Sequence, residues 1–215
     1  MAISGILTIL LGFKVGKNIG GIALGLVFAS FLALSPVMIA VASQIWNPNL
    51  IPLFIVLFMY CVQLIFISLE KNKRVNGLYF LFVWEIMSLT SFFLVIFEHK
   101  HAETIKAGIL YFIMTHIGTM FLLAAVVLLY GATNTFDFWQ VRSLAETIPG
   151  WLKDIVFVLA LLGFGTKAGI IPLHIWLPKA HSAAPSHVSA MMSGVMIKMG
   201  IFMLFRISLD IFPNI

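Results

Sequence analysis

The sequence predicts an all-α fold, a polytopic bundle of transmembrane helices. Of the 215 residues, 61% are hydrophobic and only 10% are charged, whereas an ordinary soluble domain has about 25% charged residues. The apolar residues form long unbroken runs instead of the alternating pattern of barrel strands. Because only helices and closed barrels satisfy backbone hydrogen bonds in lipid, these runs predict membrane-spanning helices.

The apolar runs give the expected elements in order. Residues 1–13 are fewer than the roughly 20 that a spanning helix needs, so we interpret them as a retained partial span. The basic start and the small-residue cleavage site of a signal peptide are missing from them. Short links such as "KVGKN" and "EHKHAETIK" favour antiparallel neighbours. Six fuller spans are predicted at approximately 19–43, 50–69, 77–97, 107–130, 151–177 and 188–209.

One link is longer than the others. Residues 131–150 mix apolar side chains such as Trp139 with charged ones such as Arg142. This composition fits a short helix lying at the membrane interface, and it fits a plain surface loop equally well.

The single cysteine, Cys61, excludes a disulfide framework or an iron–sulfur site supplied by this chain alone. The sequence has no basic cluster with interleaved aromatic residues, so nothing in it indicates nucleic-acid binding. We expect the lipid bilayer to surround this chain.

Three charged residues lie deep inside the predicted spans, away from the span ends, namely Glu85, Lys167 and Lys198. Each central charge costs about 2.5–3.5 kcal/mol, so three unpaired charges would cost on the order of 8–10 kcal/mol. One interpretation is an ion pair that only pins helices together, although such pairs are weak evidence for stability. The interpretation that we favour is that the three groups bind and release protons, because intramembrane ionisable groups usually serve a function.

Two histidines also lie within the predicted spans. His116 is in the middle of "ILYFIMTHIGTMFLL", and His174 follows Lys167 by seven residues. On a continuous helix this spacing is two turns along one face, about 10 Å, so waters would have to bridge the gap. Each histidine is either a satisfied core residue or a proton relay. A haem held by the two is a formal alternative, but the sequence has no haem-attachment motif, and we expect no metal site.

Glycines and a proline surround Lys167. Gly165, Gly169 and Pro172 weaken the helix there, so we predict a broken helix at this point. Non-helical backbone at membrane depth is tolerated only against protein or a water-filled cavity. A simple packing kink would leave the same pattern. The lysine at the break favours a hydrated path.

Several phrases in the same order resemble a known superfamily. They are "FVWEIMSLTSFFLV", "YFIMTHIGTMFLL" and "PLHIWLPKAHSAAPSHVSAMMSGVMIK". The superfamily comprises the antiporter-like membrane subunits of respiratory complex I, Mrp-type cation/proton antiporters and membrane-bound nickel–iron hydrogenases. Within it, the phrases are most similar to the large membrane subunit of formate hydrogenlyase-type hydrogenases. The resemblance covers about residues 50–210 and implies one five-helix antiporter-like repeat at residues 50–215. Residues 1–49 lie outside it, and their apolar runs predict an N-terminal hydrophobic region of one or two helices.

The resemblance also implies residue roles. Glu85 corresponds to the intramembrane glutamate of the family, Lys167 to the lysine of its broken helix and Lys198 to the lysine of the next helix. In the family these residues form half of a proton path. His181 matches the histidine of the "P-x-A-H" element, and His116 matches that of the "T-H-x-G" phrase. The candidate relays are therefore His116, His174 and His181.

In one respect the sequence departs from the family pattern. The family builds its channel from two inverted five-helix repeats, whereas this sequence holds the first and stops at "FPNI". A site at a repeat interface needs both halves. We therefore expect the second half on another polypeptide or in a missing part of this protein.

The function that we predict is proton translocation, or exchange of sodium for protons, within an energy-converting oxidoreductase complex of a prokaryotic cytoplasmic membrane. The chain itself is expected to be a non-redox subunit without a cofactor. Nickel–iron and iron–sulfur centres are expected in partner subunits of a peripheral redox arm, next to further membrane subunits. The alternatives are a stand-alone Mrp-type cation/proton antiporter subunit and a purely structural membrane anchor for a hydrogenase arm.

Overall fold

A computed structural model describes residues 2–34, 51–68, 76–98 and 101–211. Helices make up most of these residues, and the predicted all-α class is confirmed. The chain divides into two compact units, Met1–Leu64 and Ile65–Ile215. The domain boundary predicted between residues 49 and 50 involves positions outside the described residues, and it stays a prediction.

The first unit contains a helix that folds back on itself. The two arms of α1 (Ala2–Leu34) meet at Gly20 and Gly21, where Gly21 has a φ of 79° that suits glycine. The prediction that "KVGKN" is a link was wrong, because the helix continues through it and the chain turns at the glycine pair. Lysine is a good helix former, so charge alone did not mark a loop. The end of the predicted span 19–43 lies outside the described residues.

The arms of α1 lie very close together. A Cβ atom added to Gly16 would be 2.7 Å from the carbonyl oxygen of Leu24. After the arms comes α3 (Ile51–Ser68), whose Gln63 side chain donates a hydrogen bond to the carbonyl of Val15 over 3.1 Å. Small residues thus allow the backbone of this unit to pack against itself, as they do between membrane helices.

The second unit holds the remaining predicted spans. Its principal helices are α4 (Gly77–Val95), α5 (Ala102–Thr133), α7 (Gly150–Ala168), α8 (Trp176–Ala183), α9 (Ser186–Met191) and α10 (Ile197–Arg206). Helices α9 and α10 are joined by the π-helical segment η5 (Met192–Met196), so that they run on as one rod that ends with the π-helical segment η6 (Ile207–Ile211).

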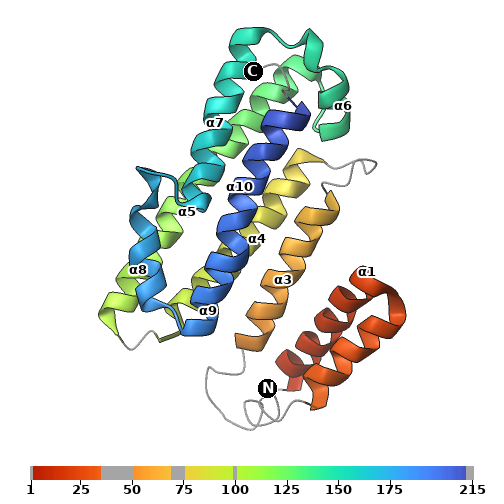
Figure 1. The fold of residues 1–215 in the computed structure, drawn as a ribbon, viewed down its shortest axis with the longest axis vertical. Coiled ribbons are helices and arrows are strands. Elements are labelled where there is room, and N and C mark those ends of the chain that lie inside the picture. The colour runs from red at the N-terminus through yellow and green to blue at the C-terminus, as the bar shows by residue number, and fades with distance from the viewer. Residues whose placement is uncertain (1, 35–50, 69–75, 99–100, 212–215) are drawn as a thin grey trace. The chain divides into compact units, whose positions relative to one another are not determined.

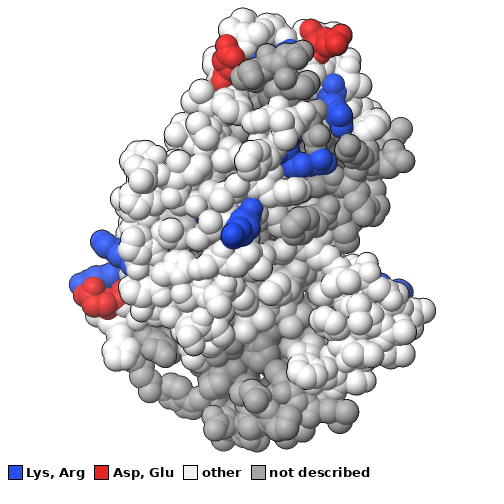
Figure 2. Space-filling model, viewed as in Figure 1, with Lys and Arg blue, Asp and Glu red and all other residues white. Residues whose placement is uncertain are grey.

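Five stretches among the described residues are long and apolar enough to cross a membrane. They are Ile6–Ala33, Gly77–Val95, Ala102–Thr133, Gly150–Ala183 and Ser186–Leu209. The first includes the turn at Gly20 and Gly21, and Leu53–Ile65 is a shorter apolar helix. Figure 2 shows one face of the molecule, on which Lys, Arg, Asp and Glu side chains are sparse. Residues of the other types form most of the described surface there. These features agree with a chain that lies in a membrane.

The segment 131–150 forms a cap at one end of the second unit. It contains the short helix α6 (Phe138–Ser143), whose first turn is capped by the side chain of Asp137. The amide of Gly77 donates to the carbonyl of Phe136 over 2.7 Å, which ties the start of α4 to this segment. Of the two forms predicted for this link, the structure therefore contains a short helix. Apolar side chains close this end of the unit, namely Ala125, Leu129, Val141, Ile148, Leu152 and Val156.

Glycines allow the long helices to cross at short range. A Cβ atom on Gly118 of α5 would lie 3.0 Å from the carbonyl oxygen of Gly163 on α7, and a Cβ atom on Gly163 would lie 2.8 Å from that of Gly118. On α10, a Cβ atom on Gly200 would lie 2.9 Å from the carbonyl oxygen of Phe164. Helix α7 is therefore held tightly by two neighbours just before it reaches Lys167.

Candidate functional site: a buried lysine at a helix break

The helix that carries Lys167 ends one residue later. Gly169 follows in the left-handed conformation, with a φ of 72°, and its amide donates to the carbonyl of Gly165. The amide of Ile170 donates to the same carbonyl over 2.9 Å. This is the arrangement by which glycine commonly ends a helix. Of the three residues predicted for the break, Gly169 and Pro172 lie in it, while Gly165 lies inside α7 and supplies the carbonyl that closes it.

A buried tryptophan satisfies another carbonyl at this break. The indole Nε1–H of Trp176, at the start of α8, donates to the backbone oxygen of Thr166 over 2.7 Å. The Trp176 side chain is fully buried. In a continuous helix the amide of Ile170 would donate to the Thr166 carbonyl, but here it donates to Gly165. Trp176 therefore compensates for a hydrogen bond that the break removes.

Lys167 is buried at this break, with 2% of its surface exposed. Its ammonium lies 5.5 Å from the ring centroid of Trp84 and 5.7 Å from that of Tyr111, which are distances for cation–π attraction. Phe164, one turn earlier on α7, packs edge-on against Trp84 at a centroid distance of 5.2 Å. Aromatic rings from α4, α5 and α7 thus exclude lipid from the amine.

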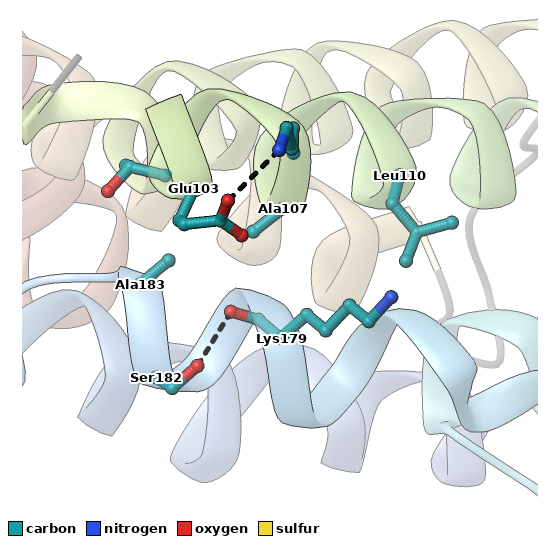
Figure 3. A pocket seen from close by; sticks show the side chains of 8 residues that line it. Glu103, Ala107, Leu110, Lys179, Ser182 and Ala183 are labelled. Atoms are coloured by element: carbon teal, nitrogen blue, oxygen red, sulfur yellow. Dashed lines mark hydrogen bonds and ion pairs between the residues drawn. The ribbon is translucent and has the colours of Figure 1, made fainter. Parts of the chain in front are cut away.

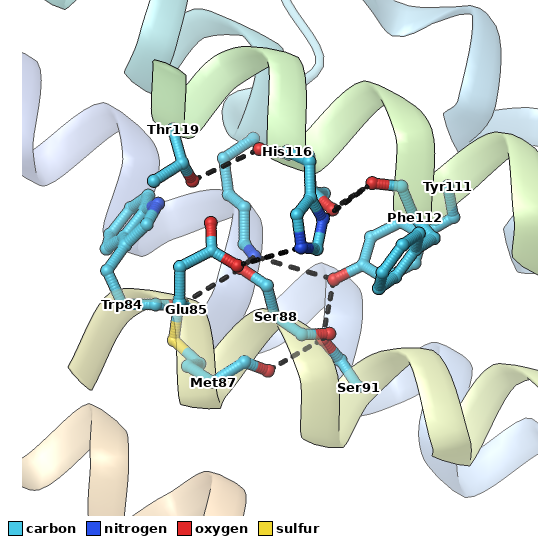
Figure 4. Close-up of polar contacts among 11 residues, drawn as sticks. Trp84, Glu85, Met87, Ser88, Ser91, Tyr111, Phe112, His116 and Thr119 are labelled. Atoms are coloured by element: carbon cyan, nitrogen blue, oxygen red, sulfur yellow. Dashed lines mark hydrogen bonds and ion pairs between the residues drawn. The ribbon is translucent and has the colours of Figure 1, made fainter. Parts of the chain in front are cut away.

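Two hydroxyl groups are the hydrogen-bond partners of Lys167. Its Nζ donates to Ser88 Oγ on α4 and, over 3.5 Å, to the Tyr111 hydroxyl on α5. The Tyr111 hydroxyl also lies 2.5 Å from Ser91 Oγ. Figure 4 shows Ser88, Ser91 and Tyr111 converging between α4 and α5. All four of these residues are buried.

Glu85 pairs with a histidine and not with the buried lysine. Its Oε2 lies 3.3 Å from His116 Nε2, and Figure 4 shows the two side chains pointing toward one another. The other carboxyl oxygen, Oε1, is buried and has no hydrogen-bond partner among the described residues. On α4, Glu85 lies three residues before Ser88, the hydrogen-bond partner of Lys167, and hence on the same face.

The contact between Glu85 and His116 is an ion pair when the histidine is protonated. His116 Nδ1 lies 3.0 Å from the backbone oxygen of Phe112, so each ring nitrogen faces an oxygen acceptor. A backbone carbonyl and a carboxylate only accept hydrogen bonds, and an imidazole can donate to both at once only with a hydrogen on each nitrogen. The arrangement therefore suits a pair that can accept a proton.

The other candidates lie away from this network. His174 follows the break in the short helix η4 (Leu173–Ile175), so the spacing of two turns expected along one helix does not apply. Its Nδ1 is buried without a hydrogen-bond partner among the described residues. His181 Nδ1 lies 2.6 Å from Ser189 Oγ on α9. Lys198 is exposed on the second unit, because α10 turns Met199, Gly200 and Met203 inward instead.

A surface pocket lies where α5 and α8 meet. It has a volume of about 470 Å³ and is lined partly by Glu103, Lys106 and Lys179 (Figure 3). Glu103 and Lys106 form an ion pair of 3.0 Å, and both side chains are mostly exposed. The Ser182 hydroxyl donates a hydrogen bond to the backbone carbonyl oxygen of Lys179. This bond does not involve the Lys179 ammonium. Within the described ranges, no group of three His, Cys, Asp or Glu side chains is placed to hold a metal ion.

Sequence reasoning missed three residues of the lysine site, namely Ser88, Tyr111 and Trp176. A signal for Ser88 was available, because Glu85, Ser88 and Ser91 recur at a spacing of three along one predicted span. That spacing places them near one another on a helix face. The two aromatic residues gave no such signal, because tyrosine and tryptophan in an apolar span look like ordinary packing residues.

Comparisons with known proteins identify the family. The family model described as NADH:quinone oxidoreductase/Mrp antiporter, TM, matches residues 75–215. "Hydrogenase-4 component B" of Escherichia coli (strain K12) is 46% identical over 136 residues, which are 63% of this chain and 20% of that protein. "NADH-quinone oxidoreductase subunit M" of Rickettsia typhi is 28% identical over 207 residues, which are 95% of this chain and 40% of that protein.

A solved structure has the same fold. A chain of the membrane-bound sulfane sulfur reductase, described as an archaeal respiratory membrane complex, aligns with a TM-score of 0.60 and 22% identity, covering 96% of this chain and 52% of that one. This chain spans about a fifth and about two fifths of the two curated relatives. The family match nevertheless extends over more than half of the sequence. The protein is therefore an integral membrane member of the NADH:quinone oxidoreductase/Mrp antiporter family.

Proposed function

We propose that this chain carries part of a proton path in an energy-converting oxidoreductase complex, with Lys167 as the central proton carrier. The single observation that supports this most is the surroundings of Lys167. An amine lies almost fully buried at a helix break in an apolar span, bonded to two hydroxyls and near the pair of Glu85 and His116. Ionisable groups at such positions usually mark ion pathways.

The proposed switch uses two partners for Glu85. In the structure Glu85 Oε2 contacts His116, while Oε1 is buried and unbonded among the described residues. An unbonded buried oxygen is costly, so a hydrogen bond from Lys167 to it would be favourable. When Glu85 turns toward Lys167, it stabilises the ammonium. When it turns toward His116, the ammonium keeps only its hydroxyl partners and releases a proton more readily.

The energies involved are of a suitable size. Moving one charge across 100 mV takes about 2.3 kcal/mol. Leaving a buried charged group without its hydrogen-bond partner costs about 1–3 kcal/mol or more. Exchange of the Glu85 carboxylate between His116 and Lys167 is thus large enough to gate a proton, and small enough to be reversed by a change in a neighbouring subunit.

Lys198 is proposed to take the proton onward, although it lies on the surface of the second unit. An ammonium exposed to lipid in a spanning helix is costly. Further protein or a hydrated cavity is therefore expected to cover it. The second inverted repeat of the antiporter-like fold, or another membrane subunit, would serve this purpose. His174 and His181 remain candidate relays toward the aqueous phase on the α8 side.

The driving reaction is proposed to take place elsewhere in the complex. "Hydrogenase-4 component B" and "NADH-quinone oxidoreductase subunit M" are named as parts of oxidoreductases. A peripheral arm with nickel–iron and iron–sulfur centres is the proposed electron-transfer partner. No electron-transfer role is proposed for this chain.

Two alternatives keep the fold but change the role. A stand-alone cation/proton antiporter subunit would use Glu85 and Lys167 without redox partners, and identification of the co-purified subunits distinguishes it. A purely structural anchor would hold its charges in permanent contacts. The unbonded Glu85 Oε1 argues against the anchor, since a permanent contact would be expected to use both carboxyl oxygens.

The deciding experiment replaces Lys167 by Met. Membrane vesicles that contain the assembled complex are supplied with its electron donor, and proton uptake is followed with a pH-sensitive dye. We expect uptake to be abolished while the subunits still co-purify. The matched control is Lys153→Met, which removes another lysine from α7, near its start and less deeply buried. Equal uptake in the two variants would reject Lys167 as the carrier.

A further inference from the structure

The two hydroxyls beside Lys167 have a property that other acceptors lack. A hydroxyl can accept a hydrogen bond through its lone pairs or donate one through its proton. A carboxylate or a backbone carbonyl can only accept. An ammonium group has three donors and no acceptor, whereas a neutral amine also has a lone pair that can accept. A partner that serves both forms of a lysine must therefore be able to reverse its role.

In the structure both hydroxyls have a neighbouring acceptor to which they can donate their own proton. Ser88 Oγ donates to the backbone oxygen of Trp84 over 2.9 Å. The Tyr111 hydroxyl lies 2.5 Å from Ser91 Oγ and 3.2 Å from the sulfur of Met196. Ser91 in turn donates to backbone oxygens of α4. Each hydroxyl can therefore accept from Lys167 while it donates to a neighbour.

The same contacts allow the reverse arrangement. Ser88 or Tyr111 can rotate its hydroxyl proton toward a neutral Lys167 amine. The acceptor that then loses its hydrogen bond from Ser88 or Tyr111 is destabilised only slightly. The Trp84 carbonyl lies within α4 and has the hydrogen bonding of that helix available. The Met196 sulfur is a weak acceptor, and Ser91 keeps its bonds to α4. The cost of either arrangement is small.

We infer that Ser88 and Tyr111 are positioning residues that keep Lys167 bonded in both its protonated and its neutral form. This inference rests on the proposed function of Lys167 as a proton carrier. Tyr111 is fully buried, and its ring packs on Trp176 at a centroid distance of 4.9 Å. It therefore also fixes the amine relative to the break that Trp176 closes. Through Met196 it reaches η5, the π-helical segment just before Lys198.

The test removes the hydroxyls and leaves the shapes. Tyr111→Phe and Ser88→Ala each delete one hydroxyl, and we expect each to lower the rate of proton uptake per assembled complex by about tenfold. Ser88→Thr keeps a hydroxyl and should retain most of the rate. Tyr130→Phe is the matched control, because Tyr130 lies on the same helix α5 but is exposed and stacks on Phe136.

Two further measurements separate positioning from a structural role. The pH dependence of uptake should change in Tyr111→Phe and Ser88→Ala but not in Tyr130→Phe, because only the first two contact Lys167. The double variant of Ser88 and Tyr111 should be non-additive, since both hydroxyls serve one amine. The titratable groups from the neighbouring helices that bear on this profile are Glu85, His116 and Tyr111 itself.

The outcomes distinguish this inference from the proposed function. If Lys167→Met abolishes uptake while Tyr111→Phe matches Tyr130→Phe, the positioning role is wrong and the carrier role stands. If Ser88→Thr is as slow as Ser88→Ala, the hydroxyl is not the essential feature, and the inference is also overturned. If Lys167→Met leaves uptake unchanged, the proposed function fails instead. Should Tyr111→Phe not assemble, the Ser88 pair of variants decides alone.

Discussion

The crossing of α5 and α7 gives the prediction with the firmest structural basis. Gly163→Ala adds a Cβ atom that would lie 2.8 Å from the backbone oxygen of Gly118, and closer still to the side chain of Leu122. A backbone atom cannot move aside as a flexible side chain can. The two helices must therefore separate slightly, and overpacking of this kind costs about 1–3 kcal/mol.

Gly131→Ala is the matched control for this change. Gly131 also lies in a helix, α5, but a Cβ atom there would have nothing within 4 Å. Both substitutions gain the same helix propensity, about 1 kcal/mol, so their difference isolates the crowding at the crossing. For a chain of this size, about 1–3 kcal/mol corresponds to a difference in Tm of roughly 2–12 °C.

Thermal unfolding of the purified protein in detergent measures this difference. We expect Gly163→Ala to unfold at the lower temperature of the two. Lys167 lies four residues after Gly163 on the same helix, so the Gly163 variant should also lose proton uptake per complex, whereas the Gly131 variant should not. Equal Tm values for the two variants would contradict the close approach of α5 and α7.

Three further predictions concern the break and the pair of Glu85 and His116. Gly169→Ala places a side chain on backbone with a φ of 72°, so we expect a loss of roughly 1–2 kcal/mol in thermal unfolding, and an unchanged midpoint would contradict the left-handed cap. Trp176→Phe leaves the Thr166 carbonyl without its donor and should cost about 1–3 kcal/mol; if Tm does not fall, that bond is not needed to close the break. His116→Phe should lower proton uptake by at least about tenfold, and the double variant with Glu85→Gln should be no slower than the single ones; simple additivity of the two effects would show that the pair does not act as a unit.

Much of the fold follows from the sequence, because hydrophobic run length is a strong signal in a membrane. The four predicted spans of the second unit correspond to helices or to helix pairs in the structure. The break after Lys167 was also predictable, since glycine and proline act on the backbone locally. The charges of "KVGKN" did not mark the turn of α1, because the helix continues through the lysines and the chain turns at the adjacent glycine pair.

The partners within the site could not be predicted in the same way. Whether Glu85 meets Lys167 or His116 depends on the rotation of three helices about their axes, and apolar spans with little amphipathic pattern do not specify that rotation. Lys198 illustrates the same point, because its inward or outward direction depends on which face of α10 packs against α7. The sequence identifies the charged residues of the site, whereas tertiary packing determines which groups they contact.

The early end of α7 has an electrostatic consequence of its own. Peptide dipoles aligned along a helix leave about half a negative elementary charge at its C-terminus. Because α7 stops at Ala168, that partial charge falls beside Lys167, in the interior of the apolar stretch Gly150–Ala183. The backbone thus supplies an attraction for a cation that does not depend on any side chain. Substitution of any one neighbour leaves this attraction in place, and only restoring a continuous helix would remove it.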